Sequence, residues 1–559
     1  MSRLGRHPST DDYRIRVVTT ACAARLLPLL LLLALPAAVQ AQFTFTTNTE
    51  NTITITGYIG TNRVLIIPSM TNGLPVTSIG FRAFYSYASL TSVIIPDSVT
   101  DIGTSAFYGC SSLTNVTIGN GVTSIGIWSF QNCTSLTNVA IPNSVTNIGE
   151  LAFAYCSSLT SITIGSGLTS IGSQEFFYCT NLTAIVVDAA NSSFASMDGV
   201  LFNQNQTILV SFPEGKIGSY TIPTNVVSIA NDAFEYCSSL TNVTIPDSVT
   251  NIGDGVFYHC VKLTSLTLPN NITSIGNWAF QSCDSLTTIN VPSGVTSIGD
   301  GVFYHCAKLT SLTLPNNIAS IGNYAFQYCD SLTTIIIPSG VTNVGIGAFS
   351  YCTKLTAITA DVLNSAYASA DGVLFNKSTN TLIQCPGGKV GSYIVPNSVT
   401  SIGYDAFSSC TRLTSVTISD SVTSIGNNAF YSCTSLRGVY FQGNTPNFDP
   451  YGGFYNDSFA TVYYLPGTTN WGTTFGGRPT KLWNPLAQTS DAIFGVQTNR
   501  FGFNITGTTN IPIVIEACAD LASPVWVPLQ SCTLTNGSVY FCDPQWTNYP
   551  GRFYRFRSP

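Results

Sequence analysis

A pattern of apolar and polar positions repeats every 23 residues along most of this chain. Written generally it is I-G-x-x-A-F-x-x-C-x-x-L-T-x-V-x-I-P, and one copy runs from Ile102 to Ile118. The first residues of the thirteen copies are Ile79, Ile102, Ile125, Ile148, Ile171, Ile229, Ile252, Ile275, Ile298, Ile321, Val344, Ile402 and Ile425. A fixed period of roughly 20 to 29 residues indicates a solenoid, in which stacked units bury one continuous core.

Each copy predicts a strand and a compact turn. The phrase L-T-x-V-x-I alternates apolar and polar positions, so Leu113, Val116 and Ile118 are expected to face inward and Asn115 and Thr117 outward. The phrase A-F-x-x-C-x-x-L has an apolar residue at every third position, which favours a short helix or 3₁₀ turn. Stacking therefore predicts a parallel sheet on the concave side and short helical or 3₁₀ turns on the convex side, about 60 Å long for thirteen coils.

The repeated phrase closely resembles the BspA-like branch of leucine-rich-repeat surface proteins, over about residues 43 to 485. The resemblance implies a leucine-rich-repeat solenoid. Members of that branch act in adhesion to host proteins or other cells. The resemblance therefore implies a recognition protein but does not identify its partner.

Breaks in the period divide the chain. The heads of two neighbouring copies are 58 residues apart at two places, which is one repeat plus 35 residues, and the two insertions are copies of each other. Each reads as a β-hairpin. The predicted organisation is a signal peptide (1–41), an N-terminal cap (42–78), a solenoid (79–465) with hairpin insertions near 187–222 and 360–395, a linker (466–489) and a small all-β, sandwich-like C-terminal module (490–559).

The N-terminus has the features of an export signal. Arg14, Arg16 and Arg25 supply positive charge, residues 26–35 are apolar, and a small-residue site precedes Gln42. The apolar run of about ten residues is too short to span a membrane, although an uncleaved anchor is the alternative. We therefore expect a secreted or cell-surface protein without a transmembrane segment in its mature chain.

Composition changes the list of partners. Only 9% of residues are charged and the formal net charge is −6. Binding to nucleic acid requires clustered Lys and Arg, so nucleic acid is not an expected partner. We expect a monomer that binds an extracellular protein or glycan.

Cysteine is abundant, with 17 residues, but its spacing argues against a disulfide framework. Twelve occupy the same repeat position: Cys110, Cys133, Cys156, Cys179, Cys237, Cys260, Cys283, Cys306, Cys329, Cys352, Cys410 and Cys433. A residue at the same inward position of every coil acts as a small buried hydrophobe. We predict free thiols, with bridges between coils as the alternative, and no metal or cofactor site, since structural metal sites use closely paired Cys or added His.

The C-terminal region leaves two alternatives open. Cys518, Cys532 and Cys542 are odd in number, so at most one pair is bridged, and Cys532–Cys542 across a hairpin is the pairing considered against free thiols. A basic run, Arg552 to Arg557, is interpreted either as a solvated edge that discourages aggregation or as a contact for an anionic envelope.

No catalytic constellation is present in the sequence. His259 and His305 both occur in V-F-Y-H-C, 46 residues apart, and are explained by duplication of a two-repeat block. Asp198 and Asp371 each precede Gly and are interpreted as turn residues, because a calcium loop needs several closely spaced oxygen ligands. We therefore predict a non-enzymatic protein, whereas a cleft with converging carboxylates would indicate catalysis.

Outward strand positions are the predicted binding face. They are Asn115, Thr117, Asn138, Ser161, Thr163, Asn242, Thr244, Ser265, Thr267, Thr288, Asn290, Ser311, Thr313, Ser415 and Thr417. The face is rich in hydroxyl groups and poor in the Trp, Tyr and Arg that dominate protein interfaces. The alternative is a structural spacer or envelope component, attached through the C-terminal module.

Overall fold

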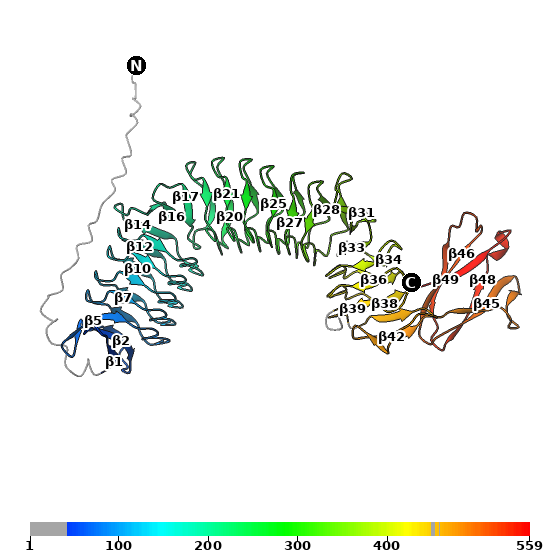
Figure 1. Cartoon of the computed structure of the whole chain (residues 1–559), viewed down its shortest axis with the longest axis horizontal. Coiled ribbons are helices and arrows are strands. Elements are labelled where there is room, and N and C mark those ends of the chain that lie inside the picture. Colours follow the sequence, from blue (N-terminus) through cyan, green and yellow to red (C-terminus); the bar gives the residue numbers. More distant parts are fainter. Residues whose placement is uncertain (1–41, 449–452, 458) are drawn as a thin grey trace, which may run out of the picture.

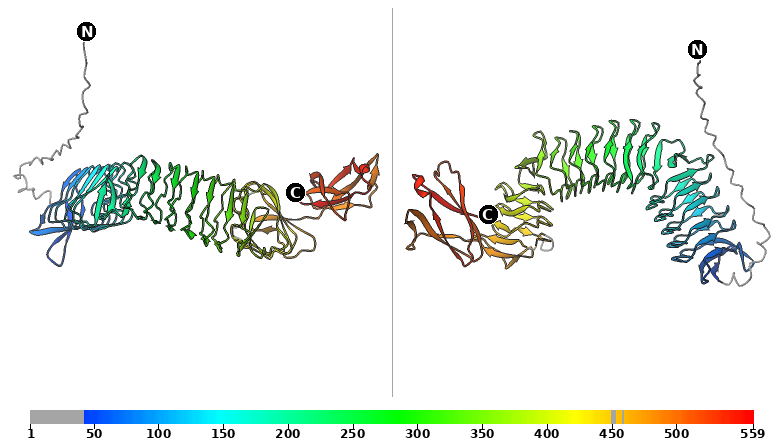
Figure 2. Two further views of the ribbon diagram at one scale, coloured as in Figure 1. Left: turned by 90° about the horizontal axis from the view of Figure 1, so that it is seen from above. Right: turned by 180° about the vertical axis from the view of Figure 1, so that it is seen from behind.

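The computed structural model describes residues 42–448, 453–457 and 459–559. The predicted signal peptide, residues 1–41, lies outside the described residues. The rest forms an arch of stacked coils followed by a β-rich module beside the last coils (Figures 1 and 2). Within the described ranges, no helix has the length and hydropathy needed to cross a bilayer.

Each coil contributes a longer and a shorter strand. The longer strands are β3 (Val64–Ile66), β6 (Ser92–Ile94), β8 (Asn115–Thr117), β10 (Asn138–Ile141), β12 (Ser161–Ile164), β14 (Ala184–Val187), β18 (Gly218–Thr221), β20 (Leu240–Thr244), β22 (Ser265–Thr267), β24 (Thr288–Asn290), β26 (Ser311–Thr313), β28 (Thr334–Ile337), β30 (Ala357–Ala360), β34 (Gly391–Ile394), β36 (Leu413–Ile418), β38 (Gly438–Phe441) and β40 (Thr461–Tyr464). The shorter strands are β7 (Asp101–Ile102), β9 (Ser124–Ile125), β11 (Asn147–Ile148), β13 (Ser170–Ile171), β19 (Ser228–Ile229), β21 (Asn251–Ile252), β23 (Ser274–Ile275), β25 (Ser297–Ile298), β27 (Ser320–Ile321), β29 (Asn343–Val344), β35 (Ser401–Ile402), β37 (Ser424–Ile425) and β39 (Asn447–Phe448), and β5 (Leu74–Ile79), which is longer, pairs with the first of them. Neighbouring coils pair in parallel at the repeat register, as Val93 with Val116 and Ile102 with Ile125.

The segment A-F-x-x-C forms a run of turns, not the predicted short helix or 3₁₀ turn. Its N–H groups alternate between two kinds of acceptor. Ala106 N donates to Gly103 O in its own coil (3.2 Å), whereas Phe107 N donates to Ser129 O in the next coil (2.7 Å). A helix would keep all these bonds within the segment, so stacking replaces helix formation. The part of the chain that the structure describes holds one short 3₁₀ helix, η2 (Trp546–Asn548).

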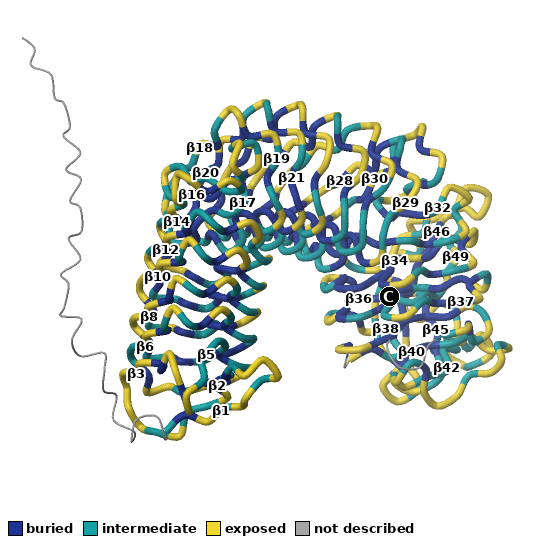
Figure 3. The backbone as a smooth tube through the Cα atoms, turned by 60° about the vertical axis from the view of Figure 1, so that its left-hand side comes forward, coloured by how far each residue is buried: buried dark blue, intermediate teal, exposed yellow. Residues whose placement is uncertain are grey.

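Two ladders of side chains fill the core of the array. Phe84, Phe107 and Phe130 stack on one another with ring centroids 4.9 and 5.1 Å apart, and later coils continue the ladder. The repeated Cys form a second ladder. Their thiols donate to Phe carbonyl oxygens, as Cys110 Sγ does to Phe84 O at 3.2 Å, except that Cys410 Sγ donates to Cys385 O and Pro386 O. All twelve are buried and free, which confirms the prediction. Buried positions recur in every coil along the array (Figure 3).

Both insertions fold as three antiparallel strands. They are β15 (Phe194–Met197), β16 (Val200–Asn203) and β17 (Ile208–Ser211), then β31 (Tyr367–Ala370), β32 (Val373–Asn376) and β33 (Thr381–Gln384). The arch changes direction near each (Figure 1). The core also divides there, because Leu201 packs with the coils before the first insertion and Val200 with the coils after it. Asp198 and Asp371 adopt φ of 52° and 51°, as expected for turn residues.

Other strands close the two ends of the array. At the N-terminal end β1 (Phe43–Thr47) pairs antiparallel with β2 (Ile53–Tyr58), and β2 pairs in parallel with β5. β4 (Met70–Thr71) pairs antiparallel with β5. At the other end β42 (Arg478–Leu482) pairs in parallel with β40 and antiparallel with β41 (Thr474–Phe475). The segment predicted as a linker therefore contributes a strand to the solenoid sheet.

The C-terminal module consists of two sheets. One holds β43 (Leu486–Gln488), β44 (Gly495–Gln497), β45 (Arg500–Thr506) and β48 (Ser538–Asp543), and the other holds β46 (Pro512–Cys518), β47 (Val527–Thr533) and β49 (Phe553–Arg557). Cys532 and Cys542 lie in different sheets and are free, so the considered bridge between them is wrong.

The basic strand of this module is paired internally. Glu516, with 4% of its surface exposed, receives Arg555 at 2.7 Å and Arg557 at 2.5 Å, and Arg552 contacts Asp543 at 3.0 Å. β49 is an edge strand of its sheet, and the Arg555 and Arg557 side chains remain 47% and 35% exposed, which agrees with the interpretation as a solvated edge. The sequence did not reveal that these arginines also pair with buried acids, because those acids lie on other strands.

Candidate functional site

The predicted strand face lies along the longer strands, and most of its side chains are exposed. Five of them, Asn115, Thr117, Asn138, Ser161 and Thr163, line a shallow hollow of about 390 Å³ across β8, β10 and β12. Within it Ser161 donates to Asn138 Oδ1 at 2.7 Å. The structure thus brings one part of the predicted set together on a single small surface.

Ser415 and Thr417, in contrast, are covered by the end of the chain. The Ser415 hydroxyl donates to the carbonyl oxygen of Pro559, and Thr417 Oγ1 lies 3.1 Å from Ser558 Oγ. Only 4% of Ser415 remains exposed. These two members of the predicted face are therefore used in an intramolecular contact.

Much of the repeated threonine has a structural task. Thr114 Oγ1 donates to Thr91 O in the preceding coil at 2.9 Å, and Thr123 Oγ1 donates to Thr100 O at 3.0 Å. The same bond recurs in most coils. Many of the threonine hydroxyls therefore hold neighbouring coils together by hydrogen bonds, so their abundance does not by itself indicate ligand binding.

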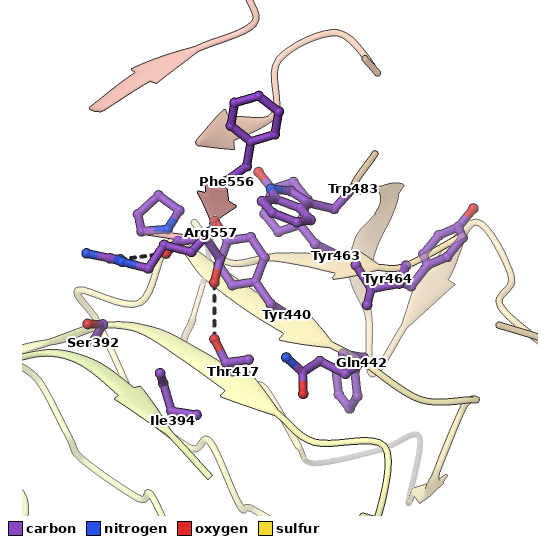
Figure 4. Close-up of a pocket in the computed structure, with 14 residues that line it drawn as sticks. Ser392, Ile394, Thr417, Tyr440, Gln442, Tyr463, Tyr464, Trp483, Phe556 and Arg557 are labelled. Carbon is purple, nitrogen blue, oxygen red and sulfur yellow. Dashed lines mark hydrogen bonds between the residues drawn. The ribbon is translucent and has the colours of Figure 1, made fainter. Parts of the chain in front are cut away.

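An aromatic pocket of about 240 Å³ lies between the last coils and the C-terminal module (Figure 4). Tyr440 and Tyr463 stack with centroids 4.7 Å apart, and Trp483 donates from Nε1 to Pro512 O at 3.0 Å. Tyr440 pairs in register with Thr417, so tyrosine replaces a hydroxyl residue where the module docks. We interpret this pocket as the joint between the two parts, and the change from Thr to Tyr is the sequence signal that marks it.

A different surface gathers the groups expected of a binding site. It is an open groove of about 680 Å³ on the turn segments, spanning the coils headed by Ile171 to Ile321. Its aromatic side chains are Phe177, Tyr236, Tyr258, Trp278, Tyr304 and Tyr324, and its acids and amides are Asp232, Glu235, Asp254, Gln174, Gln281 and Gln327. No Lys, Arg or His is among the described residues that line it. We call it the turn-side groove.

The local sequence explains how the groove forms. Its large side chains occupy the variable positions of G-x-x-A-F-x-x-C, which differ from coil to coil. Trp278 lies against Gly301 of the next coil, where a Cβ would come 1.8 Å from Trp278 Cε3, so that glycine makes room for the ring. The Trp278 and Tyr304 rings meet edge to face at 5.9 Å. Sequence reasoning missed this surface because it examined only the strand positions.

A cavity of about 300 Å³ adjoins the groove at the first insertion. Four carboxyl groups line it, from Glu175, Glu214, Asp232 and Glu235, and we call it the acid cavity. Tyr178 N donates to Glu214 Oε1 at 2.7 Å, but Glu214 Oε2 has no hydrogen-bond partner among the described residues. The Gln174 amide donates to both oxygens of Glu235, at 3.0 and 3.2 Å.

Burial raises the pKa of these acids. Desolvation raises the pKa of Glu175 to about 7 and that of Glu214 to about 9. It also raises the pKa of Glu235 to about 8, with a further contribution from Asp232. Glu214 and Glu235 therefore hold protons near neutral pH, and Glu175 is about half protonated, unless a positive charge enters. In the described ranges, no group of three His, Cys, Asp or Glu is arranged to hold a metal ion.

The two histidines lie on turn segments outside this cavity. His305 Nδ1 is 2.8 Å from Asp284 Oδ1, and the His259 ring packs on Tyr236 with centroids 4.8 Å apart. Each is explained by packing with its neighbours, in line with the interpretation as duplicated structural residues.

The sequence matches the family described as BspA type leucine rich repeat region (6 copies), over residues 77–208, 210–331, 279–385 and 384–474. No curated protein matches it. A leucine-rich repeat protein from Eubacterium ventriosum is similar in structure, with a TM-score of 0.50 and 26% identity, covering 60% of this chain and 92% of that chain. A leucine rich cell surface protein from Faecalibacterium prausnitzii is 31% identical (TM-score 0.39; 57% and 93% covered). A leucine-rich repeat protein from Bacteroides ovatus is 24% identical (TM-score 0.40; 71% and 93% covered).

Proposed function

Since this chain belongs to the BspA-type leucine-rich-repeat family, we propose that it is an exported recognition protein that binds an extracellular protein or glycan through its repeats. The observation that carries the proposal is the turn-side groove. Binding energy in protein interfaces concentrates in Trp, Tyr and Arg, and the groove offers one Trp, four Tyr and one Phe. The hollow on β8, β10 and β12 is a second candidate surface, without such anchors.

Export and surface location belong to the same proposal. They rest on the charged and apolar residues before Gln42, because surface adhesion proteins must leave the cell. Mass spectrometry of the secreted protein should find Gln42 as its first residue. A mature chain that begins at Met1 would contradict the export signal.

The alternative role is a spacer or envelope component that is attached through the C-terminal module. The aromatic joint at Tyr440, Tyr463 and Trp483 favours it, because a firmly packed module can carry load from the array. A spacer needs no anchoring side chains on its turns, so substitutions in the groove would leave its attachment unchanged.

The acid cavity could also suggest hydrolysis by a pair of carboxyl groups. Such a pair needs one neutral acid and one ionised partner in different environments. Here burial raises the pKa of all four acids, Glu175, Glu214, Asp232 and Glu235, so none of them is singled out as a stabilised ionised partner. We therefore favour binding.

The test is binding of the purified chain to a glycan array and to a panel of extracellular-matrix proteins. Trp278→Ala should reduce saturable binding about tenfold or more, as expected for an anchor residue. Trp128→Ala is the matched control, because Trp128 occupies the same repeat position with a similar φ (56° against 57°) but does not line the groove. Equal losses in both variants, or no saturable binding at all, would contradict recognition through the groove.

A further inference from the structure

We propose that the turn-side groove and the acid cavity together receive an extended basic segment of a partner protein, with a Lys or Arg head group entering the acid cavity. This inference rests on the proposed recognition function and names the chemistry of the partner. Lys and Arg share the feature that the acid cavity would recognise, which is a nitrogen cation that donates hydrogen bonds.

The unpaired oxygen of Glu214 points to such a donor. Glu214 is 8% exposed, its Oε2 has no partner among the described residues, and it lines the cavity. A buried acceptor without a partner is unfavourable until a donor reaches it. Glu175, which is 5% exposed, lines the same cavity. An ammonium or guanidinium group supplies several N–H donors and a compensating charge.

The surroundings favour a cation over a neutral ligand. Four carboxyl groups line the cavity, and Asp254 lies in the adjoining groove. No basic residue is among the described residues that line either space. The partly buried rings of Tyr258, Trp278 and Tyr304, which line the groove, can in addition hold cationic side chains by cation–π contact. A neutral glycan would use the rings but would bring no positive charge to the acids.

The dimensions favour an extended chain over a small amine. The groove crosses the coils headed by Ile171, Ile229, Ile252, Ile275, Ile298 and Ile321. The five coils headed by Ile229 to Ile321 follow one another without an insertion, and with about 4.8 Å between coils they span about 19 Å. An extended peptide advances about 3.4 Å per residue, so roughly six residues would lie along this part of the groove.

The second insertion argues that the acids are not required by the fold. The positions of Glu175, Glu214 and Glu235 correspond to Ala348, Gly387 and Ser408, each 173 residues further along the chain. Both insertions nevertheless form the same three antiparallel strands. Glu214 of the first insertion and Glu175 and Glu235 of the flanking coils are therefore not needed to build the insertion, and binding of a cation gives them a role.

The raised pKa values of Glu175, Glu214 and Glu235 support the same inference, because an entering cation lowers the pKa of each acid. Binding near neutral pH should then release protons. The titratable groups near Glu214 on the neighbouring elements are Glu235, Tyr155 and the thiols of Cys179, Cys237 and Cys260, and burial raises the pKa of all five. Calorimetry in two buffers of different ionisation enthalpy measures the released protons.

The experiment is titration of the intact chain with an oligolysine peptide, an oligoglutamate peptide, a neutral Gly-Ser peptide and spermidine. We expect oligolysine alone to bind tightly. The triple variant Glu175→Ala, Glu214→Gly and Glu235→Ser, which copies the second insertion, should weaken that binding about tenfold or more. The shape-preserving variant Glu175→Gln, Glu214→Gln and Glu235→Gln should do the same, which guards against a folding defect in the first.

The matched control removes three exposed acids elsewhere, through Glu50→Gln, Asp420→Asn and Asp520→Asn, and should leave affinity within about twofold, since exposed distant charges are screened. Oligolysine binding that is equal in all variants would overturn the inference, as would spermidine binding as tightly as the peptide. If oligolysine fails but a matrix protein or glycan still binds in a Trp278-dependent way, the inference is wrong and the proposed function stands. If nothing binds, the proposed function fails as well.

Discussion

The two insertions are copies of one sequence, yet they differ in what they bury. In both, an Asn closes the start of the insertion and an Asp-Gly pair turns the first hairpin. At the first insertion Glu175, Glu214 and Glu235 line one cavity, and Glu175 and Glu214 are buried there, whereas the second keeps one acid at the corresponding site, Asp405, aligned with Asp232. The strands follow from the shared residues, and the chemistry follows from the residues that diverged.

The shared part should show the largest effect on stability. Asn191 Nδ2 donates to Gly165 O and Leu168 O, and Asn191 Oδ1 accepts from two N–H groups of the insertion. Asn364 repeats all four bonds. Asn191→Ala and Asn364→Ala should each lower the free energy of unfolding by about 3 to 5 kcal/mol, because buried polar groups lose their partners.

Chemical denaturation measures this effect, with the exposed Asn205→Ala as control, for which a change within about 0.5 kcal/mol is expected. Similar losses at the two asparagines would support a common scaffold. A small loss at either would mean that its insertion is held by other contacts.

The acids that differ between the two insertion regions should affect how the stability of the protein depends on pH. Desolvation raises the pKa of Glu175 from 4.5 to about 7, and those of Glu235 and Glu214 further. Below about pH 4.5 these groups are protonated in both states, so their contribution is fully present. As the pH rises toward 9 the unfolded chain releases protons first, so stability falls, by about 3 kcal/mol for Glu175 alone.

Denaturation at about pH 5 and about pH 9 measures this loss. The triple variant that copies the second insertion should reduce it, while Asp405 and Asp457 retain a smaller loss, since burial also raises their pKa values, to about 6 and about 7. An unchanged pH dependence in the triple variant would mean that the carboxyl groups of the acid cavity are better solvated than their burial indicates.

Introducing a Glu into the second insertion, at the position that corresponds to Glu214, should destabilise the protein, because there is no space for the side chain. A Cβ at Gly387 would lie 2.8 Å from Cys352 O and 3.3 Å from Ser409 O, which are backbone atoms. Gly387→Glu should therefore destabilise the protein by about 1 to 3 kcal/mol through overpacking. Gly388→Ala is the steric control: its Cβ would lie 2.7 Å from Leu355 O, so it should also destabilise the protein although it adds no acid. A stable Gly387→Glu protein would show that the second insertion can open an acid cavity of its own.

The sequence predicts the repeated part of this molecule well and the unique part poorly. Period and pattern identify the inward Phe, Cys, Leu and Ile, because each coil repeats the same local solution. The acid cavity depends on the meeting of Gln174 and Glu235, which are 61 residues apart. The covering of Ser415 by Pro559 joins residues 144 apart. No local period encodes such contacts, so they emerge only when the coils are stacked.

The ion pair of Lys389 in the second insertion should have only a small effect on stability. In the second insertion Lys389 Nζ contacts Asp371 Oδ2 at 2.5 Å and lies 5.1 Å from the Tyr393 ring, but the Asp371 side chain is 79% exposed. Solvent screens an exposed pair, so Lys389→Met should lower the free energy of unfolding by less than about 1 kcal/mol. Lys216→Met is the matched variant at the corresponding position of the first insertion. Chemical denaturation of the two at low and high salt measures the difference, which should shrink as salt is added. A difference that persists in high salt would instead assign the effect to packing of the lysine stem on Tyr393.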